Sequence, residues 1–204
     1  AAALPVAALT AWQALFDRGE ITAGQRVLIH GGSGGLGGFA VQFARWAGAQ
    51  VAATCSGANV DYLKSLGVDR VIDYRSENIS TAIKNWAPGG LDYLLDAVGV
   101  STLPNALELV RAGGTLVSIP TLVDDGDYAA AATAAQARDV KRVFSTMDDI
   151  NCAATLSKIA NLLANGEIAL PPIRELPLTE AAEAHRLIQS GHNRGKLILK
   201  VADL

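Results

Sequence analysis

The sequence predicts an α/β fold: a doubly wound parallel sheet of about six strands with helices on both faces. Short apolar runs recur along the chain, segments with helical periodicity separate them, and the runs lack a polar–apolar alternation. A strand covered on both faces has no solvent side, and parallel neighbours need a helical crossover between them. A chain of 204 residues, 50% of them hydrophobic, suits one such domain and part of a second.

The expected strands leave room for a helix between each pair and cover residues 26–30, 51–55, 70–74, 91–99, 114–120 and 141–146. A leading helix begins at Pro5, which suits a first helical turn, and stops at Gly19. Further helices are expected over residues 35–46, 58–67, 76–86, 101–114, 128–138 and 150–166. Glycines end several of these helices, because glycine readily adopts the left-handed conformation that follows a helix.

The last segment does not continue the alternation. It contains a proline-marked strand, a helix with Thr179 as its expected N-cap, and a closing strand over residues 197–201. We therefore expect residues 1–167 to form the sheet domain with its leading helix. Residues 168–204 would be an edge addition or part of a second domain.

Composition excludes several classes of function. The net charge of −3 gives no basic surface for nucleic acid or an anionic membrane. No apolar run approaches the roughly 20 residues of a membrane span. Cys55 and Cys152 stand far apart without a metal-ligand spacing, so we expect two reduced cysteines, no metal site and a cytoplasmic location.

Six glycines between residues 31 and 38 mark the turn after the first expected strand. Gly32, Gly34 and Gly37 match the spacing G-x-G-x-x-G between a strand and a helix. In this motif the first glycine permits a tight turn, the second keeps side-chain atoms away from a pyrophosphate, and the third lets the helix pack closely. The N-terminus of the helix offers free N–H groups to the phosphates. The motif predicts a Rossmann-type dinucleotide-binding domain.

A second template fits the same turn. Gly31, Gly35 and Gly37 have the spacing of short-chain dehydrogenases and polyketide ketoreductases, which also need a Tyr-x-x-x-Lys pair for proton transfer. The tyrosines of this chain are residues 62, 74, 93 and 128, and none has a lysine four positions later. This second interpretation therefore lacks its catalytic base.

Several segments in order resemble the medium-chain dehydrogenase/reductase superfamily, and most of all its zinc-independent quinone oxidoreductases. They read LPVAALTAWQAL, AGQRVLIHGGSGGLGGFAVQFARWAGAQV, LKSLGVDRVIDYR, LDYLLDAVG, GGTLVSI and GHNRGKLILKV. The resemblance implies a GroES-like catalytic domain, then an NADP(H)-binding domain, then a return of the chain to the catalytic domain. Residues 1–167 would be the cofactor domain, and residues 168–204 would be the returning segment of an incomplete GroES-like domain.

The resemblance also implies a reaction. Zinc-dependent members have a ligand cysteine shortly before the threonine of the first helix, where this chain has Val6. Without a zinc Lewis acid, hydride transfer to a quinone or to an activated C=C is more plausible than alcohol oxidation, because such acceptors are already electron-poor. We expect a quinone or α,β-unsaturated carbonyl substrate, including a carrier-bound enoyl chain, and a homodimer formed through the last strand of the sheet.

The end of the second strand bears on the choice between NADP and NAD. An acid about 20 residues beyond the glycines would bind the ribose 2′-hydroxyl and reject a 2′-phosphate. Here the strand ends in uncharged residues as far as Ser56, and the next acid is Asp61. Related quinone oxidoreductases have a lysine after the second strand and a tyrosine after the third as further contacts to the cofactor. This chain has Asn59 near the position of the lysine, and Tyr74 matches the tyrosine. We expect NADP(H), although Asn59 cannot supply the charge of a lysine.

The remaining expected cofactor contacts follow from the resemblance and lie at strand ends, where open α/β sheets bind ligands. With the motif residues they are Thr10, Gly32, Gly34, Gly35, Leu36, Gly37, Ser56, Tyr74, Val98, Gly99, Ser118, Ile119, Phe144, Ser145 and Asn193.

The sequence offers no convincing catalytic acid or base. His30 lies inside the first strand and is expected to be structural, in contact with the glycine loop, and Asp92 and Asp96 are expected to cap or pair. Two functions remain open: a zinc-independent NADPH-dependent reductase, and a nucleotide-binding domain or fragment with no independent catalysis.

Overall fold

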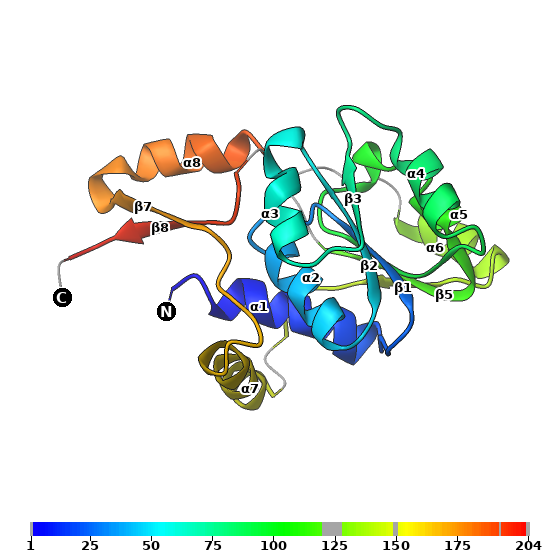
Figure 1. Cartoon of the computed structure of the whole chain (residues 1–204), viewed down its shortest axis with the longest axis horizontal. Helices are drawn as coiled ribbons and strands as arrows, with labels where there is room; N and C mark the ends of the chain where they lie inside the picture. Colours follow the sequence, from blue (N-terminus) through cyan, green and yellow to red (C-terminus); the bar gives the residue numbers. More distant parts are fainter. Residues whose placement is uncertain (1, 120–127, 149–150, 192, 203–204) are drawn as a thin grey trace.

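A computed structural model describes residues 2–119, 128–148, 151–191 and 193–202 (Figure 1). Its larger part is a six-stranded parallel sheet in the order β3-β2-β1-β4-β5-β6, which confirms the predicted doubly wound fold. The strands are β1 (Arg26–His30), β2 (Gln50–Cys55), β3 (Arg70–Asp73), β4 (Leu91–Asp96), β5 (Val110–Ser118) and β6 (Lys141–Phe144). The strand order reverses between β1 and β4, which pair with each other.

Two clusters of buried apolar side chains cover the two faces of the sheet. In β1, Val27 and Ile29 belong to one cluster and Leu28 to the other, so this strand has no solvent face. The first cluster lies beneath α1 (Pro5–Trp12), α2 (Gly37–Trp46), α3 (Val60–Ser65) and α7 (Cys152–Ala164). The second lies beneath α4 (Ile79–Trp86), α5 (Ala106–Leu109) and α6 (Tyr128–Ala137). This burial explains the absence of alternation in the sequence.

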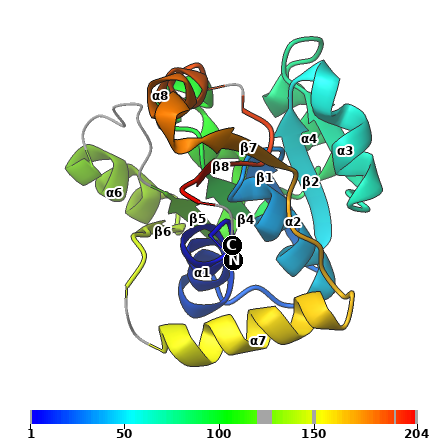
Figure 2. The ribbon, with the colours of Figure 1, turned by 90° about the vertical axis from the view of Figure 1, so that its left-hand side faces the viewer.

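The leading helix has two parts. An α-helix ends at Trp12, and a π-helix, η1 (Gln13–Arg18), continues it to the expected stop at Gly19. Helix α7 packs against α1 and runs across it (Figure 2). No helix in the described part of the chain is long and apolar enough to cross a bilayer.

Several predicted element boundaries were wrong, among them the end of the strand expected over residues 91–99, which stops at Asp96. The helix expected over residues 101–114 ends at Leu109, because Val110 already pairs with Leu91 and Gly113 has a φ of +72°, which a helix does not accept. Helix α4 begins at Ile79 rather than at residue 76, since Asn78 accepts a hydrogen bond from the Thr81 N–H and caps the helix there. Thr179 is not an N-cap.

Thr179 lies in a 3₁₀ turn, η4 (Leu178–Glu180), and the cap of α8 (Ala181–Gln189) is Glu180. Two ends of the expected elements, Pro120 and Ile150, lie outside the described residues.

The C-terminal segment forms a unit of its own. β7 (Ile173–Pro177) and β8 (Lys196–Lys200) make a two-stranded parallel sheet with α8 between them, and this unit projects from the six-stranded sheet (Figure 1). Its chain touches the larger part at the glycine loop, where the Gly195 N–H donates to the Ser33 carbonyl at 3.1 Å. The expected boundary between residues 167 and 168 falls between α7 and β7, and the division into domains stays a prediction.

Candidate functional site

A cleft of about 950 Å³ opens at the carboxyl ends of the central strands. Its walls come from the glycine loop after β1, the end of β2, residues 74–80 after β3 and residues 97–105 after β4. Because β1 and β4 are the strands between which the order reverses, the cleft lies at the switch point where doubly wound sheets bind ligands.

A second cavity of about 550 Å³ adjoins the first. It lies between α1, the start of α2, the ends of β5 and β6, and the chain that returns toward β8. Gly191 and Asn193 line both cavities, so the two cavities are neighbours. Two neighbouring cavities suit a dinucleotide better than a mononucleotide.

In the glycine loop, packing within the protein requires a glycine at Gly37 but not at Gly34. A Cβ on Gly37 would come 2.1 Å from the Gly31 carbonyl oxygen, so helix α2 can approach the loop only without a side chain there. A Cβ on Gly34 would meet no protein atom closer than 3.5 Å, although Gly34 lines the larger cleft. The protein itself therefore leaves room at Gly34, and a phosphate group against the bare backbone would account for glycine there.

The N-terminus of α2 faces the same region. Its N-cap, Leu36, makes no side-chain hydrogen bond to the first turn. The first N–H groups of this helix thus lack a side-chain acceptor, and the positive end of the helix dipole favours an anion beside them.

A buried polar group joins the walls of the larger cleft. His30, the last residue of β1, is 3% exposed, and its ring contacts the hydroxyls of Thr54 and Thr102 at 2.8 Å and 2.9 Å. Burial lowers the pKa of His30 below its ordinary value, and the charge of Asp96 opposes this shift only in part. Asp96 itself accepts hydrogen bonds from the N–H groups of Val98 and Gly99.

The far end of the larger cleft carries hydroxyl and amide groups. The Asn59 side-chain amide donates to the Ser56 hydroxyl at 3.2 Å, and Tyr74 remains 43% exposed at the rim. An acid lies close by: a Cβ on Gly57 would come 2.8 Å from a carboxylate oxygen of Asp73. Burial, together with the charge of Asp73, raises the pKa of the neighbouring Cys55 thiol to about 11.

An unsatisfied hydroxyl lines the smaller cavity. Ser145 is fully buried, and its Oγ has no hydrogen-bond partner among the residues that the structure describes. A buried hydroxyl without a partner costs free energy, and a polar group of a ligand in this cavity would satisfy it. Thr10, across the cavity, donates its hydroxyl to the Val6 carbonyl at 2.7 Å.

The comparisons with known proteins decide the family. A family model described as zinc-binding dehydrogenase matches residues 66–199. The chain belongs to that family. The resemblance to medium-chain dehydrogenases/reductases is thereby confirmed. Among the residues that the structure describes, no three His, Cys, Asp or Glu side chains gather where they could hold a metal ion.

The relatives named here are of two kinds. A spectinabilin polyketide synthase system protein from Streptomyces orinoci is 36% identical over 98% of the chain, and an NAD(P)H oxidoreductase of bovine mitochondria is 33% identical over 98% of it. The chain spans only 9% of the first protein and 55% of the second.

Solved structures agree with these relatives. The CurK enoyl reductase superposes with a TM-score of 0.85 at 28% identity, and covers 98% of this chain and 61% of its own. The quinone oxidoreductase from Coxiella burnetii superposes with a TM-score of 0.84 at 32% identity, and the match covers 99% of this chain and 60% of that one.

The structure brings most of the expected cofactor contacts of this family member to the two cavities. The larger cleft is lined by Gly34, Ser56, Tyr74, Val98 and Asn193. The smaller is lined by Thr10, Gly35, Leu36, Ile119, Ser145 and Asn193. The others do not line either cavity: Gly32, Gly37, Gly99, Ser118 and Phe144. Of these, Gly32 and Gly37 pack against the protein inside the glycine turn. Phe144, at the end of β6, is 44% exposed.

Sequence reasoning missed several residues that line the two cavities. Thr54 and Thr102 hold the His30 ring, Asn78 and Asn105 line the larger cleft beside the starts of α4 and α5, and Lys196 lines the smaller cavity. The signal for Thr54 was its place near the end of a predicted strand. Thr102 and Asn105 gave no signal, because the segment after β4 was expected to be one continuous helix.

Proposed function

We propose that this chain is the cofactor-binding part of an NADPH-dependent oxidoreductase that transfers hydride to a quinone or an activated C=C without zinc. The observation that carries the proposal is the pair of neighbouring cavities at Asn193, with an open glycine position in one and, among the described residues, an unsatisfied buried hydroxyl in the other. The names of an NAD(P)H oxidoreductase and of quinone and enoyl reductases among its relatives support the same reaction class.

The residues present fit a nicotinamide dinucleotide. The larger cleft would hold its adenosine end near Ser56 and Tyr74, and the turn at Gly34 with the N-terminus of α2 would bind its phosphates. In the smaller cavity, the Ser145 hydroxyl would orient the nicotinamide ring by a hydrogen bond to its amide. When bound, the reduced nicotinamide supplies the hydride.

The chain itself contributes position rather than acid–base chemistry. Ile119 and Leu36 give the smaller cavity apolar walls that exclude water from one side of the ring. A fixed orientation lowers the entropic barrier to transfer, and an electron-poor acceptor needs little further polarisation.

A nucleotide-binding module without catalysis of its own is the alternative. Side chains around the smaller cavity favour it, since Val6, Met147 and Ile188 are 63%, 44% and 50% exposed and leave the substrate side open. We also propose a homodimer through β6, since among the described strands β6 pairs only with β5 and leaves an edge free. Light scattering tests this state directly.

Titration with NADPH and NADH, followed by nicotinamide fluorescence, tests the site. Tighter binding of NADPH is the expected result, and steady oxidation of NADPH by a quinone or an enone in the intact protein supports the reductase. Binding without any turnover would favour the module, and binding of neither nucleotide would overturn both proposals.

A further inference from the structure

The ring of His30 joins the two loops that wall the larger cleft. On one side lies Thr54 Oγ, which also accepts a hydrogen bond from the Gly31 N–H at 2.9 Å, at the start of the glycine loop. On the other lies Thr102 Oγ, which donates to the Gly99 carbonyl at 2.7 Å, in the loop after β4. The chain of hydrogen bonds therefore runs from one wall of the cleft to the other through a single imidazole.

The positions of the hydroxyl protons determine which nitrogen of the ring carries hydrogen. The hydroxyl proton of Thr102 is used toward Gly99, so this oxygen must accept from Nε2–H of His30. Thr54 Oγ accepts from the Gly31 N–H and has its own proton free to donate to Nδ1. The opposite tautomer would leave the Thr54 proton without an acceptor and would take the Thr102 proton from Gly99.

We propose that His30 is a positioning residue for the nucleotide: a neutral imidazole, protonated at Nε2, that fixes the glycine loop and the Gly99 loop at the separation the dinucleotide needs. The inference rests on the proposed function and adds a residue to it. His30 would act through the backbone at Gly31 and Gly99, not by proton transfer, since both ends of the chain are main-chain groups.

The surroundings of the ring support a role in spacing the loops. A Cβ on Gly31 would come 2.7 Å from the Val98 side chain, so the two loops already touch at this point. Asp96, which pairs with His30 across the sheet, fixes the base of the second loop through the Val98 and Gly99 N–H groups. Asp96 thus anchors the base of the loop after β4, and His30 links that loop to the glycine loop. A histidine that only filled the core would not require this directed chain.

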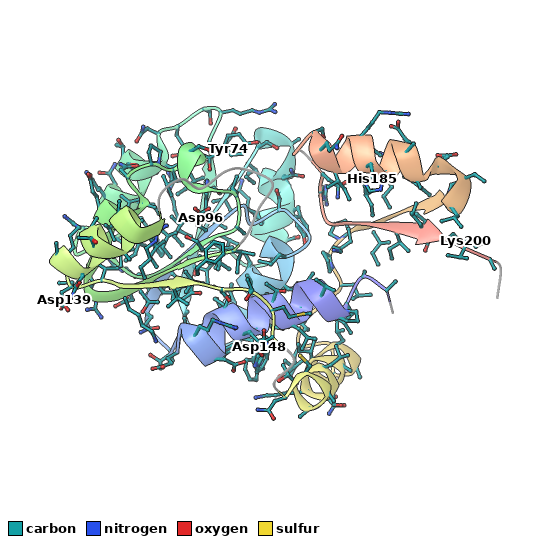
Figure 3. All side chains as sticks on the ribbon, turned by 180° about the vertical axis from the view of Figure 1, so that it is seen from behind. Tyr74, Asp96, Asp139, Asp148, His185 and Lys200 are labelled. Atoms are coloured by element: carbon teal, nitrogen blue, oxygen red, sulfur yellow. The ribbon has the colours of Figure 1, made fainter. Side chains whose placement is uncertain are left out.

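Matched variants test the two halves of this chain of hydrogen bonds separately. His30→Asn places an acceptor near Nδ1 and loses the donor to Thr102, whereas His30→Gln places a donor near Nε2 and loses the acceptor for Thr54. Thr102→Val removes the hydroxyl at nearly constant volume. His185→Asn is the control, because His185 is exposed on α8, outside the sheet (Figure 3).

NADPH affinity of the intact protein is the first measurement. His30→Asn and Thr102→Val should each weaken binding about three- to tenfold, and the double variant should be no weaker than either, because both remove the same hydrogen bond. His30→Gln should leave the Thr102 link intact and lose affinity through the Gly31 side alone. The His185 control should bind like the wild type.

The nitrogen-15 shifts of the His30 ring are the second measurement, and simple packing would not determine them. The free protein should show hydrogen on Nε2, and Thr102→Val should shift the Nε2 signal. If His30→Asn does not fold, Thr102→Val and the ring spectrum still decide the question. Hydrogen on Nδ1, additive losses, or variants that bind within about twofold of a wild type that does bind would overturn the inference and leave the proposed function standing. A wild type that binds no nucleotide would overturn both.

Discussion

The side chain of Gln13 makes three hydrogen bonds to Asp148, a residue 135 positions later in the chain. Gln13 Nε2 donates to the Asp148 carbonyl at 3.1 Å and to its carboxylate at 2.9 Å, and Gln13 Oε1 accepts from the Asp148 N–H at 3.1 Å. Arg18 adds hydrogen bonds to the Asp148 carboxylate and the Thr146 carbonyl, both at 2.8 Å. Asp148 lies beside the leading helix (Figure 3), so the π-helical turn anchors the segment that follows β6.

This anchor predicts a role for Gln13 in the shape of the smaller cavity, because Ser145, Thr146 and Met147 line it just before Asp148. Gln13→Leu should lower the free energy of unfolding by about 1–3 kcal/mol, since it removes the three part-buried hydrogen bonds between this side chain and Asp148. It should also weaken NADPH binding. Urea unfolding and nicotinamide fluorescence measure the two effects.

Arg186→Ala is the control for Gln13→Leu, because the ion pair of Arg186 with Glu183 is exposed. Its effect on stability should stay within about 0.5 kcal/mol. Unchanged nucleotide binding in a folded Gln13→Leu variant would show that the anchor does not set the cavity.

The glycine loop predicts opposite behaviour for two alanine variants. Gly34→Ala should leave stability within about 0.5 kcal/mol of the wild type, since the new methyl group meets no protein atom within 3.5 Å, and should weaken nucleotide binding. Gly37→Ala should cost about 1–3 kcal/mol of stability, because its methyl group would overlap the Gly31 carbonyl. Thermal unfolding with and without NADPH measures both. Equal nucleotide affinity in Gly34→Ala and the wild type would show that no phosphate group binds against Gly34.

The position of the Asp73 carboxylate predicts how the preference for NADPH over NADH can be increased. Its carboxylate lies against Gly57, next to Ser56, where a 2′-phosphate would bind. Asp73→Asn should therefore tighten NADPH binding about threefold or more at low salt and change NADH binding less, because it removes a like charge. Asp139→Asn, far from Tyr74 in Figure 3, is the control. Equal gains for both nucleotides would place the 2′-phosphate elsewhere.

The fold followed from the sequence because each strand carries its own evidence. Val27, Leu28 and Ile29 are consecutive and apolar, and such a short run of β-branched and apolar residues before a glycine turn is typical of a strand buried on both faces. The ends of helices and strands were harder to predict where local sequence preference and long-range strand pairing compete. Residues 110–113 follow a helical pattern without a break, yet the pairing of Val110 with Leu91 draws them into β5. Such pairing depends on residues distant in sequence and leaves no local signal.

The site was predictable where a backbone rule requires one residue type and unpredictable where side chains meet by folding. The glycines gave the turn, because close approach of backbone permits no other residue at Gly37. The contacts among His30, Thr54 and Thr102 join residues up to 72 positions apart. None of the three stands in a recognisable motif, so only the folded chain brings them together.

The burial of His30 predicts how stability depends on pH. The pKa of His30 is lowered in the folded state, whereas in the unfolded chain it returns to about 6.5. The unfolded state therefore binds more protons below about pH 6.5, and the stability due to neutral His30 is present above this pH and lost as the pH falls toward the folded-state pKa. The loss cannot exceed about 1.4 kcal/mol per pH unit for one group. Urea unfolding between pH 8 and pH 5 should show wild type and His30→Asn converging at the acid end. His185→Asn should follow the wild type, and parallel curves for wild type and His30→Asn would show that the pKa of His30 is the same in the folded and unfolded states.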